Sequence, residues 1–310
     1  MRSLSLDWKR LARLTGFALV SLLALVVLLH LAGAWLYAYR LLHVGCRGER
    51  ASLEGAGYPS RAVEFPSREG YTLRGWYAPG SEHPEIAIIV LPGLSGNTAF
   101  ALPDAEMLAR AGYSTLIFEH RSCADPSLLF TTGYYEAQDV LGAVDYLQTR
   151  PDVAHIGVHG FSSNGTAALL AAAQEPAIEA VVAMGGFTSL EDDILDRHLD
   201  LPLYQRAFRR LVLWSINAQL GVPAREVSPI SVIGQISPRP LLLIYGEEEA
   251  IFGEALYAAA GEPKDLWIVP GTGHGGYRAV APQEYEQRIV GFFDSVFAEQ
   301  EGGLIAAPDS

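Results

Sequence analysis

The sequence predicts an α/β fold, with a mostly parallel, doubly wound sheet that carries helices on both faces, preceded by one transmembrane helix. Two observations support this prediction. From residue 86 onward, continuous apolar runs of strand length alternate with helical segments, as in parallel sheets that are covered on both faces. Residues 16–39 contain no Asp, Glu, Lys or Arg, and this length of about 24 residues is enough to cross a bilayer.

The N-terminal part is predicted to be a membrane anchor. Basic residues lie in the segment 1–15 before the apolar stretch, and Trp35 and two tyrosines lie at its far end, like an interfacial aromatic belt. A cleaved signal peptide is the alternative, because small residues at 32–34 resemble a cleavage site. The apolar run continues past Ala34, which favours a retained single-pass anchor in contact with lipid. The basic residues before it slightly favour an N-terminus inside.

The elements after the anchor follow from composition and periodicity. Glycines and a Tyr-Pro-Ser turn signal predict a tether over residues 40–60, and the folded domain is expected over 61–299. Its first two strands, 62–65 and 71–77, are predicted to form a hairpin. Buried strands are predicted at 86–91, 114–118, 153–158, 180–184, 241–245 and 266–269, and helices at 100–111, at 134–149, after Ser163 and at 282–298. Residues 300–310 are expected to be a disordered tail.

One interval interrupts this alternation. About fifty residues separate the strand 180–184 from the strand 241–245, more than an ordinary loop requires. The interval contains the amphipathic run LPLYQRAFRRLVLWSINAQLG, so residues 188–236 are predicted to be a helical cap insertion over the edge of the sheet. Two ordinary surface helices would give the same pattern, and the sequence does not separate the two interpretations.

Composition excludes several functions. The formal net charge is −13, which disfavours a nucleic-acid partner because phosphate contacts need a basic surface. Cys46 and Cys123 are the only cysteines, which excludes a disulfide-rich scaffold and a cysteine-rich metal site. Their spacing follows no motif, so two unrelated thiols are favoured over a single bridge.

The segment HGFSSNG, residues 159–165, predicts a nucleophile on a sharp turn between a strand and a helix. Such a turn lies at the carboxyl end of a parallel strand, where ligands gather, and the helix that follows favours developing negative charge. Ser162 stands in a G-x-S-x-G frame whose second glycine is replaced by Asn164. Ser163 would put the bulky Phe161 in the place of the first glycine, so Ser162 is the preferred nucleophile.

A serine nucleophile needs a base and an orienting acid. His198 and His274 are the histidines that follow Ser162, and His198 falls within the insertion. His274 lies in GTGHGGY directly after the last predicted strand, as expected of a loop that presents an imidazole to a site. Residues 247–249 are three consecutive glutamates at the end of the strand 241–245, where the acid is expected.

Taken in order, these motifs resemble those of the α/β-hydrolase superfamily, in its dienelactone-hydrolase-like and serine-peptidase-like branch. The segment PRPLLLIYGEEE resembles the part that ends in the catalytic acid, which assigns Glu249 to that role. LPGLSGN resembles the loop whose backbone N–H, at Leu94, would join that of Ser163 in an oxyanion hole. Arg121 and Asp139 match family positions that we interpret as structural.

The resemblance implies a serine hydrolase that cleaves a small-molecule carboxylic ester, thioester or amide through an acyl-enzyme, with catalytic Ser162, His274 and Glu249 and no metal or organic cofactor. Pro92, Asn164 and Glu249 stand where the family usually has His, Gly and Asp. These departures support an alternative, a catalytically silent member that acts as a membrane-tethered binding or scaffold protein. Asn164 is expected to crowd the turn against its neighbouring strand.

Overall fold

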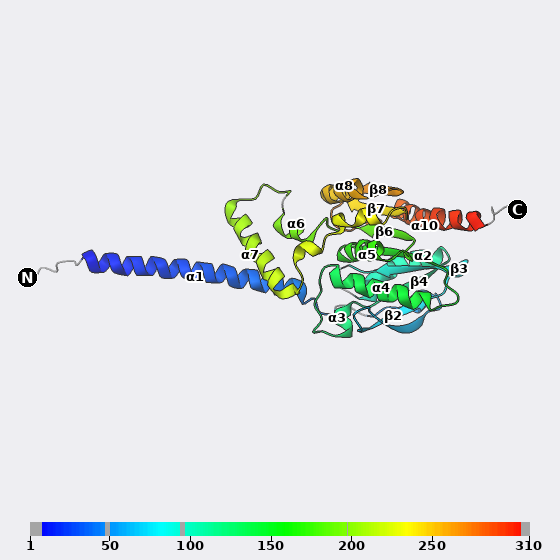
Figure 1. Cartoon of the computed structure of the whole chain (residues 1–310), viewed down its shortest axis with the longest axis horizontal. Coiled ribbons are helices and arrows are strands. Elements are labelled where there is room, and N and C mark those ends of the chain that lie inside the picture. Colours follow the sequence, from blue (N-terminus) through cyan, green and yellow to red (C-terminus); the bar gives the residue numbers. More distant parts are fainter. Residues whose placement is uncertain (1–7, 47–49, 94–96, 197, 305–310) are drawn as a thin grey trace, which may run out of the picture.

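An eight-stranded sheet organises the chain, of which the computed structural model describes residues 8–46, 50–93, 97–196 and 198–304 (Figure 1). The strand order is β1-β2-β4-β3-β5-β6-β7-β8. β2 pairs antiparallel with both β1 and β4, and all other neighbours are parallel. The predicted mostly parallel α/β sheet is therefore confirmed.

The strands are β1 (Arg61–Pro66), β2 (Thr72–Ala78), β3 (His83–Leu91), β4 (Tyr113–Phe118), β5 (His155–Phe161), β6 (Ala180–Met184), β7 (Leu241–Gly246) and β8 (Lys264–Val269). The α-helices are α1 (Trp8–Leu42), α2 (Thr98–Arg110), α3 (Arg121–Ala124), α4 (Tyr134–Gln148), α5 (Ser163–Gln174), α6 (Leu190–Leu195), α7 (Leu203–Leu220), α8 (Ala250–Ala259), α9 (Tyr277–Val280) and α10 (Pro282–Leu304). The short 3-10 helices are η1 (Leu53–Ala56), η2 (Ala224–Glu226), η3 (Pro229–Ser231), η4 (Ile233–Gln235) and η5 (Glu247–Glu249).

Helices cover both faces of the sheet, as buried parallel strands require. On one face, apolar side chains of α4, α5 and α8 join those of α7 and the end of α1 in one core cluster. On the other face, α2 and α10 pack on the sheet together with Leu53 of η1. Both layers leave the carboxyl ends of β3, β5, β6, β7 and β8 at one edge of the sheet.

Two helices extend beyond their predicted bounds. α1 begins at Trp8, before the predicted start at residue 16, because the Lys, Arg, Leu and Ala residues ahead of that point are good helix formers. At the other end α10 continues to Leu304, so the tail predicted from residue 300 does not begin there, and residues 305–310 lie outside the described residues.

Within the predicted tether, described residues on both sides of 47–49 contact the domain. Leu53 has no exposed surface, and the Ala51 N–H donates to Thr98 Oγ1 at 3.0 Å. Cys46 forms a disulfide with Cys123, 77 residues further along the chain. The prediction of two unrelated thiols is therefore wrong, because the fold brings together two segments whose spacing in sequence carries no signal.

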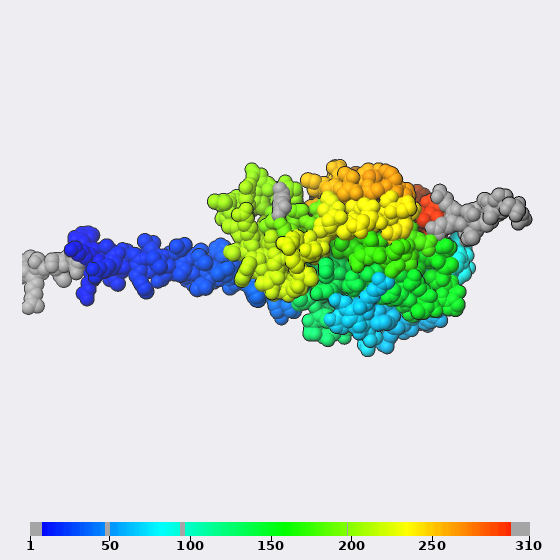
Figure 2. Space-filling view, in the orientation of Figure 1, coloured from blue at the N-terminus to red at the C-terminus, as the bar shows by residue number. Residues whose placement is uncertain are grey.

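The insertion forms α6 and α7, and α7 lies beside the C-terminal part of α1 (Figure 1). Ala34, Ala38 and Leu42 of α1 have no exposed surface, and Gln219 of α7 donates to the Trp35 carbonyl at 3.3 Å. Figure 2 shows the remainder of α1 as a rod that projects away from the folded domain.

Candidate active site

Ser162 lies on a strained turn between β5 and α5. Its φ is 59° and its ψ is −130°, a backbone conformation that non-glycine residues rarely adopt. The surrounding structure holds it in place, because the Ser162 N–H donates to Met184 O of β6 at 2.7 Å and its carbonyl accepts from Thr166 N–H at 3.1 Å. Backbone strain of this kind is common at functional sites. Here the strained turn exposes the Ser162 hydroxyl at the edge of the sheet.

Two glycines make this turn possible. A Cβ on Gly160 would lie 2.4 Å from the Asn164 carbonyl oxygen, and one on Gly165 would lie 2.9 Å from the Met184 carbonyl oxygen. The close approach to β6 is thus made by Gly165, one position after the glycine of the usual frame.

Asn164 does not crowd the turn, in contrast to the expectation from the sequence. Its side chain is buried and its Nδ2 donates to the Pro92 carbonyl, which follows β3. The amide therefore ties the start of α5 to the loop after β3, and the departure from glycine has a structural purpose.

His274 joins Ser162 to Glu249. His274 Nε2 lies 2.9 Å from Ser162 Oγ, and His274 Nδ1 lies 2.8 Å from Glu249 Oε2. A carboxylate can only accept a hydrogen bond, so the imidazole proton belongs on Nδ1 and Nε2 is left to accept from the serine hydroxyl. Phe161 supports the imidazole with its ring, at 5.1 Å between ring centroids. The structure therefore brings together the three residues that the sequence assigns to catalysis.

The three glutamates after β7 have separate contacts. Glu247 Oε2 accepts from the Gly271 N–H at 2.9 Å, and the backbone N–H of Glu248 donates to Thr272 O at 3.4 Å. Both contacts hold the loop that carries the histidine against η5. Of the three, Glu249 makes the side-chain contact with His274, which separates it from its neighbours as the candidate acid.

Tyr277 is a site residue to which the sequence interpretation gave no role, although it lies three positions after His274. Its hydroxyl donates to Glu249 Oε1, and the Gly246 N–H lies 3.4 Å from the same oxygen. The two carboxylate oxygens are thereby divided, with Oε1 facing Tyr277 and Gly246 and Oε2 facing the imidazole. These contacts hold the carboxylate in one orientation, although the Glu side chain is longer than that of the usual Asp.

The charges of the site follow from these bonds. The hydrogen bond to Glu249 raises the pKa of His274 above its ordinary value, with burial acting in the opposite direction. Burial works to raise the pKa of Glu249, but its hydrogen bonds with His274 and Tyr277 outweigh that effect and lower it. Burial and then the bond to Glu249 hold the pKa of Tyr277 well above its usual range, so Tyr277 remains a donor. Glu249 is thus ionised where His274 must be neutral.

A pocket of about 310 Å³ opens beside Ser162, His274 and Glu249. α6 supplies Asp193 and Ile194 to its wall, and α1 supplies Tyr37 and Leu41. Burial, followed by the nearby carboxylate of Asp196, raises the pKa of Asp193. No sequence pattern signals the contribution of α1, because it depends on how that helix packs on α7.

Of the two predicted oxyanion donors, Ser163 lies within the described residues. Ser163 begins α5, and the first N–H groups of a helix lack intrahelical acceptors. Leu94, the second predicted donor, lies outside the described residues. Gly93, just before it, is close to the site, since a Cβ there would lie 2.9 Å from the Phe161 ring and 3.7 Å from Ser162 Cβ.

Arg121 and Asp139 lie away from the pocket and stabilise the fold. Arg121 Nε lies 3.5 Å from Asp139, its Nη2 donates to Glu69 at 2.5 Å, and the side chain is almost fully buried. Burial raises the pKa of Asp139 to about 7.

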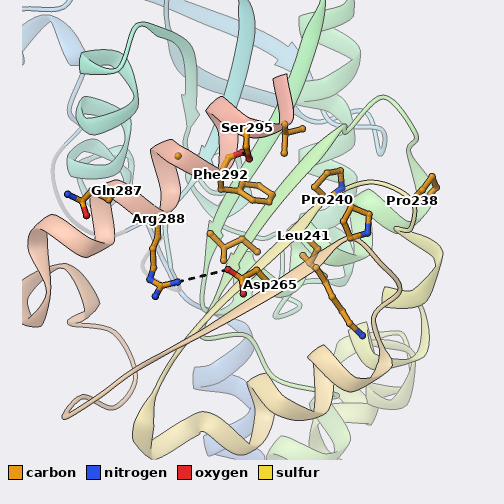
Figure 3. A pocket seen from close by; sticks show the side chains of 13 residues that line it. Pro238, Pro240, Leu241, Asp265, Gln287, Arg288, Phe292 and Ser295 are labelled. Carbon is orange, nitrogen blue, oxygen red and sulfur yellow. Dashed lines mark hydrogen bonds and ion pairs between the residues drawn. The ribbon is translucent and has the colours of Figure 1, made fainter. Parts of the chain in front are cut away.

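A hollow of about 800 Å³ lies at the opposite edge of the sheet, at the starts of β7 and β8 (Figure 3). Asp265 and Arg288 face each other across it at 4.0 Å, and Ser295 donates to the Phe292 carbonyl at 2.8 Å. Its size exceeds that of the pocket at Ser162, but the assembled Ser–His–Glu group lies at the other edge. Within the described part of the chain, no group of three or more His, Cys, Asp or Glu side chains could hold a metal ion.

Comparisons with known proteins find similar sequences and similar folds. Residues 61–209 match the X-Pro dipeptidyl-peptidase family, S15. The protein Rv2307c of Mycobacterium tuberculosis is 30% identical over 275 residues, which cover 86% of this chain and 89% of that protein. A thiohydrolase of Arthrinium phaeospermum is 30% identical over 132 residues, covering 40% of this chain and 42% of that enzyme. The esterase Pf2001 of Pyrococcus furiosus superposes with a TM-score of 0.64 at 20% identity, covering 82% of this chain and 98% of the esterase.

Proposed function

Because the chain belongs to the α/β-hydrolase superfamily, we propose that it is a membrane-anchored serine hydrolase that cleaves a carboxylic ester, a thioester or an amide through an acyl-enzyme. The observation that carries this proposal is the hydrogen-bonded chain from Ser162 Oγ through His274 to Glu249, at 2.9 Å and 2.8 Å. The matches to a peptidase family and to a thiohydrolase support the range of acyl substrates.

The reaction follows from the hydrogen bonds. Ser162 Oγ attacks the carbonyl carbon as its proton passes to His274 Nε2, and Glu249 stabilises the imidazolium through Nδ1–H. The N–H groups of Ser163 and Leu94 stabilise the oxyanion. Collapse of the tetrahedral intermediate expels the alcohol, thiol or amine, which takes the proton from Nε2. Water then attacks the acyl-enzyme with His274 again as base, releasing the acid and restoring the Ser162 hydroxyl.

Labelling by a fluorophosphonate probe tests the proposal on the purified full chain. Labelling is expected in the wild type and in Ser163→Ala, because only the backbone N–H of Ser163 is required. It is expected to vanish in Ser162→Ala and in His274→Ala. A wild-type protein that resists the probe would favour the catalytically silent binding or scaffold protein, the alternative that Pro92 and Glu249 suggest in place of the usual His and Asp.

The anchor and its orientation are part of the proposal. α1 is long and apolar enough to cross a bilayer, and its C-terminal end contributes to the pocket, which supports retention. The Cys46–Cys123 disulfide supports a domain in an oxidising compartment, with the N-terminus inside. N-terminal sequencing of membrane-extracted protein should find residues before Ala34, and alkylation of intact membranes should modify the two cysteines only after reduction. A mature terminus at Trp35 contradicts the anchor.

A further inference from the structure

In the proposed membrane-anchored arrangement, the length of α1 places the folded domain at the surface of the bilayer. Large apolar side chains between Leu11 and Leu29 are exposed around α1. At 1.5 Å per residue this part of the helix is about 28 Å long, close to the hydrocarbon thickness of about 30 Å. From His30 onward α7 packs beside α1, with the ring of Phe208 at 6.2 Å from that of His30. The bilayer can therefore surround α1 up to the point where the insertion begins to cover it.

Exposed aromatic side chains occur on both helices. Trp35 and Tyr39 of α1 are 44% and 48% exposed, and Tyr204 and Trp214 of α7 are 70% and 57% exposed. The Trp35 and Trp214 rings lie 6.2 Å apart, so the two helices present one aromatic surface. Aromatic rings of this kind favour the boundary between lipid and water.

A groove of about 490 Å³ runs between α1 and α7 and adjoins the active-site pocket. Tyr37 and Ile194 line both, and Phe208 and Val212 add apolar surface to the groove. The charge of Arg209 at the groove is paired with Asp196, and its Nη1 donates to the Ile194 carbonyl at 2.9 Å. The groove thus meets the active-site pocket at Tyr37 and Ile194, and it extends to His30 of α1.

We propose that this groove holds the hydrocarbon chain of the substrate, an ester of a long-chain fatty acid that enters from the bilayer around α1. This inference rests on the proposed serine hydrolase. The ester carbonyl reaches Ser162 while the chain lies between α1 and α7, in contact with Tyr37, Phe208 and Val212. The membrane helix is then part of the substrate site as well as an anchor.

The test uses the full chain in phosphatidylcholine vesicles, with p-nitrophenyl butyrate, laurate and palmitate. Each methylene buried in the groove should raise kcat/KM by about fourfold until the groove is filled. Gln205 is a half-buried residue of the groove, so Gln205→Trp should fill it and lower the palmitate-to-butyrate ratio of kcat/KM at least tenfold. Ala207→Trp, at an exposed position of α7 outside the groove lining, is the matched control and should leave the ratio unchanged.

Fluorophosphonate labelling of Gln205→Trp at the wild-type rate shows that the catalytic group is intact, and Val212→Phe fills the same groove two turns further along α7. A wild type that labels but hydrolyses butyrate faster than palmitate overturns the inference and leaves the proposed function standing. An unchanged ratio in both filling variants also overturns it. A wild type that neither labels nor hydrolyses any of the esters removes the proposed function and the inference together.

Discussion

Replacing Glu249 by Gln should abolish most of the activity through the protonation of His274. Tyr277 and the Gly246 N–H both donate toward Oε1 of Glu249. In Glu249→Gln the amide oxygen will occupy that side, so the NH₂ group will face His274 Nδ1. Nδ1 must then accept, the imidazole proton moves to Nε2, and Nε2 can no longer take the proton of Ser162.

The expected loss is large, because a triad whose acid becomes an amide holds its histidine in the wrong tautomer. Such a change lowers kcat by about 10⁴-fold, or about 5.5 kcal/mol of activation free energy. The assay is kcat for p-nitrophenyl butyrate together with the rate constant of fluorophosphonate labelling, which requires no knowledge of the natural substrate. Glu247→Gln is the matched control, because its amide oxygen can still accept from the Gly271 N–H.

Because Tyr277 and His274 contact different oxygens of Glu249, a second substitution is expected to restore part of the activity that Glu249→Gln loses. With Tyr277→Phe added to Glu249→Gln, only the Gly246 N–H at 3.4 Å still holds the amide oxygen, so the amide can turn that oxygen toward His274. The double variant should be at least tenfold more active than Glu249→Gln alone. Activity of Glu249→Gln within tenfold of the wild type would refute the assignment, as would a loss in Glu248→Gln that Glu249→Gln does not share.

Other predictions address pH and the turn at Ser162. kcat/KM should rise with pH as His274 loses its proton. Because Glu249 raises the pKa of His274, the midpoint of this rise should lie above the ordinary value of about 6.5 and should move to lower pH in Glu249→Gln. An unshifted midpoint in Glu249→Gln counts against the coupling of the two residues. Asn164→Gly should lower the rate of fluorophosphonate labelling, and it should lower the free energy of unfolding by about 1–3 kcal/mol in a denaturant titration. The reason is that the buried Pro92 carbonyl loses its hydrogen-bond donor. Faster labelling would contradict this. Gly160→Ala should lower the free energy of unfolding by about 1–3 kcal/mol, since its Cβ would lie 2.4 Å from the Asn164 carbonyl oxygen. Gly291→Ala is the control, because its Cβ meets no atom within 4 Å and should not destabilise the protein.

The sequence alone was sufficient for the sheet and for the choice of candidate catalytic residues. Buried parallel strands need continuous apolar runs, and these runs are visible without a structure. Ser162, His274 and the glutamates 247–249 could be selected because each follows such a run, and the carboxyl ends of parallel strands meet at one edge. The resemblance to the α/β-hydrolase superfamily then singled out Glu249 from its two neighbours. The glycines around Ser162 and His274 also indicated tight loops at these positions, since a backbone that packs closely against another segment leaves no room for a side chain.

Other features depended on contacts between segments that are distant in the chain, and only the tertiary structure decided them. The Cys46–Cys123 bridge, the tie from Asn164 to the Pro92 carbonyl and the bond from Tyr277 to Glu249 each require a known side-chain direction. The apolar composition of α1 predicts a bilayer span but carries no information about which of its residues meet α7. Whether Tyr37 faces lipid or the active-site pocket is determined by the packing of the two helices, because an apolar or aromatic side chain is stable in either environment.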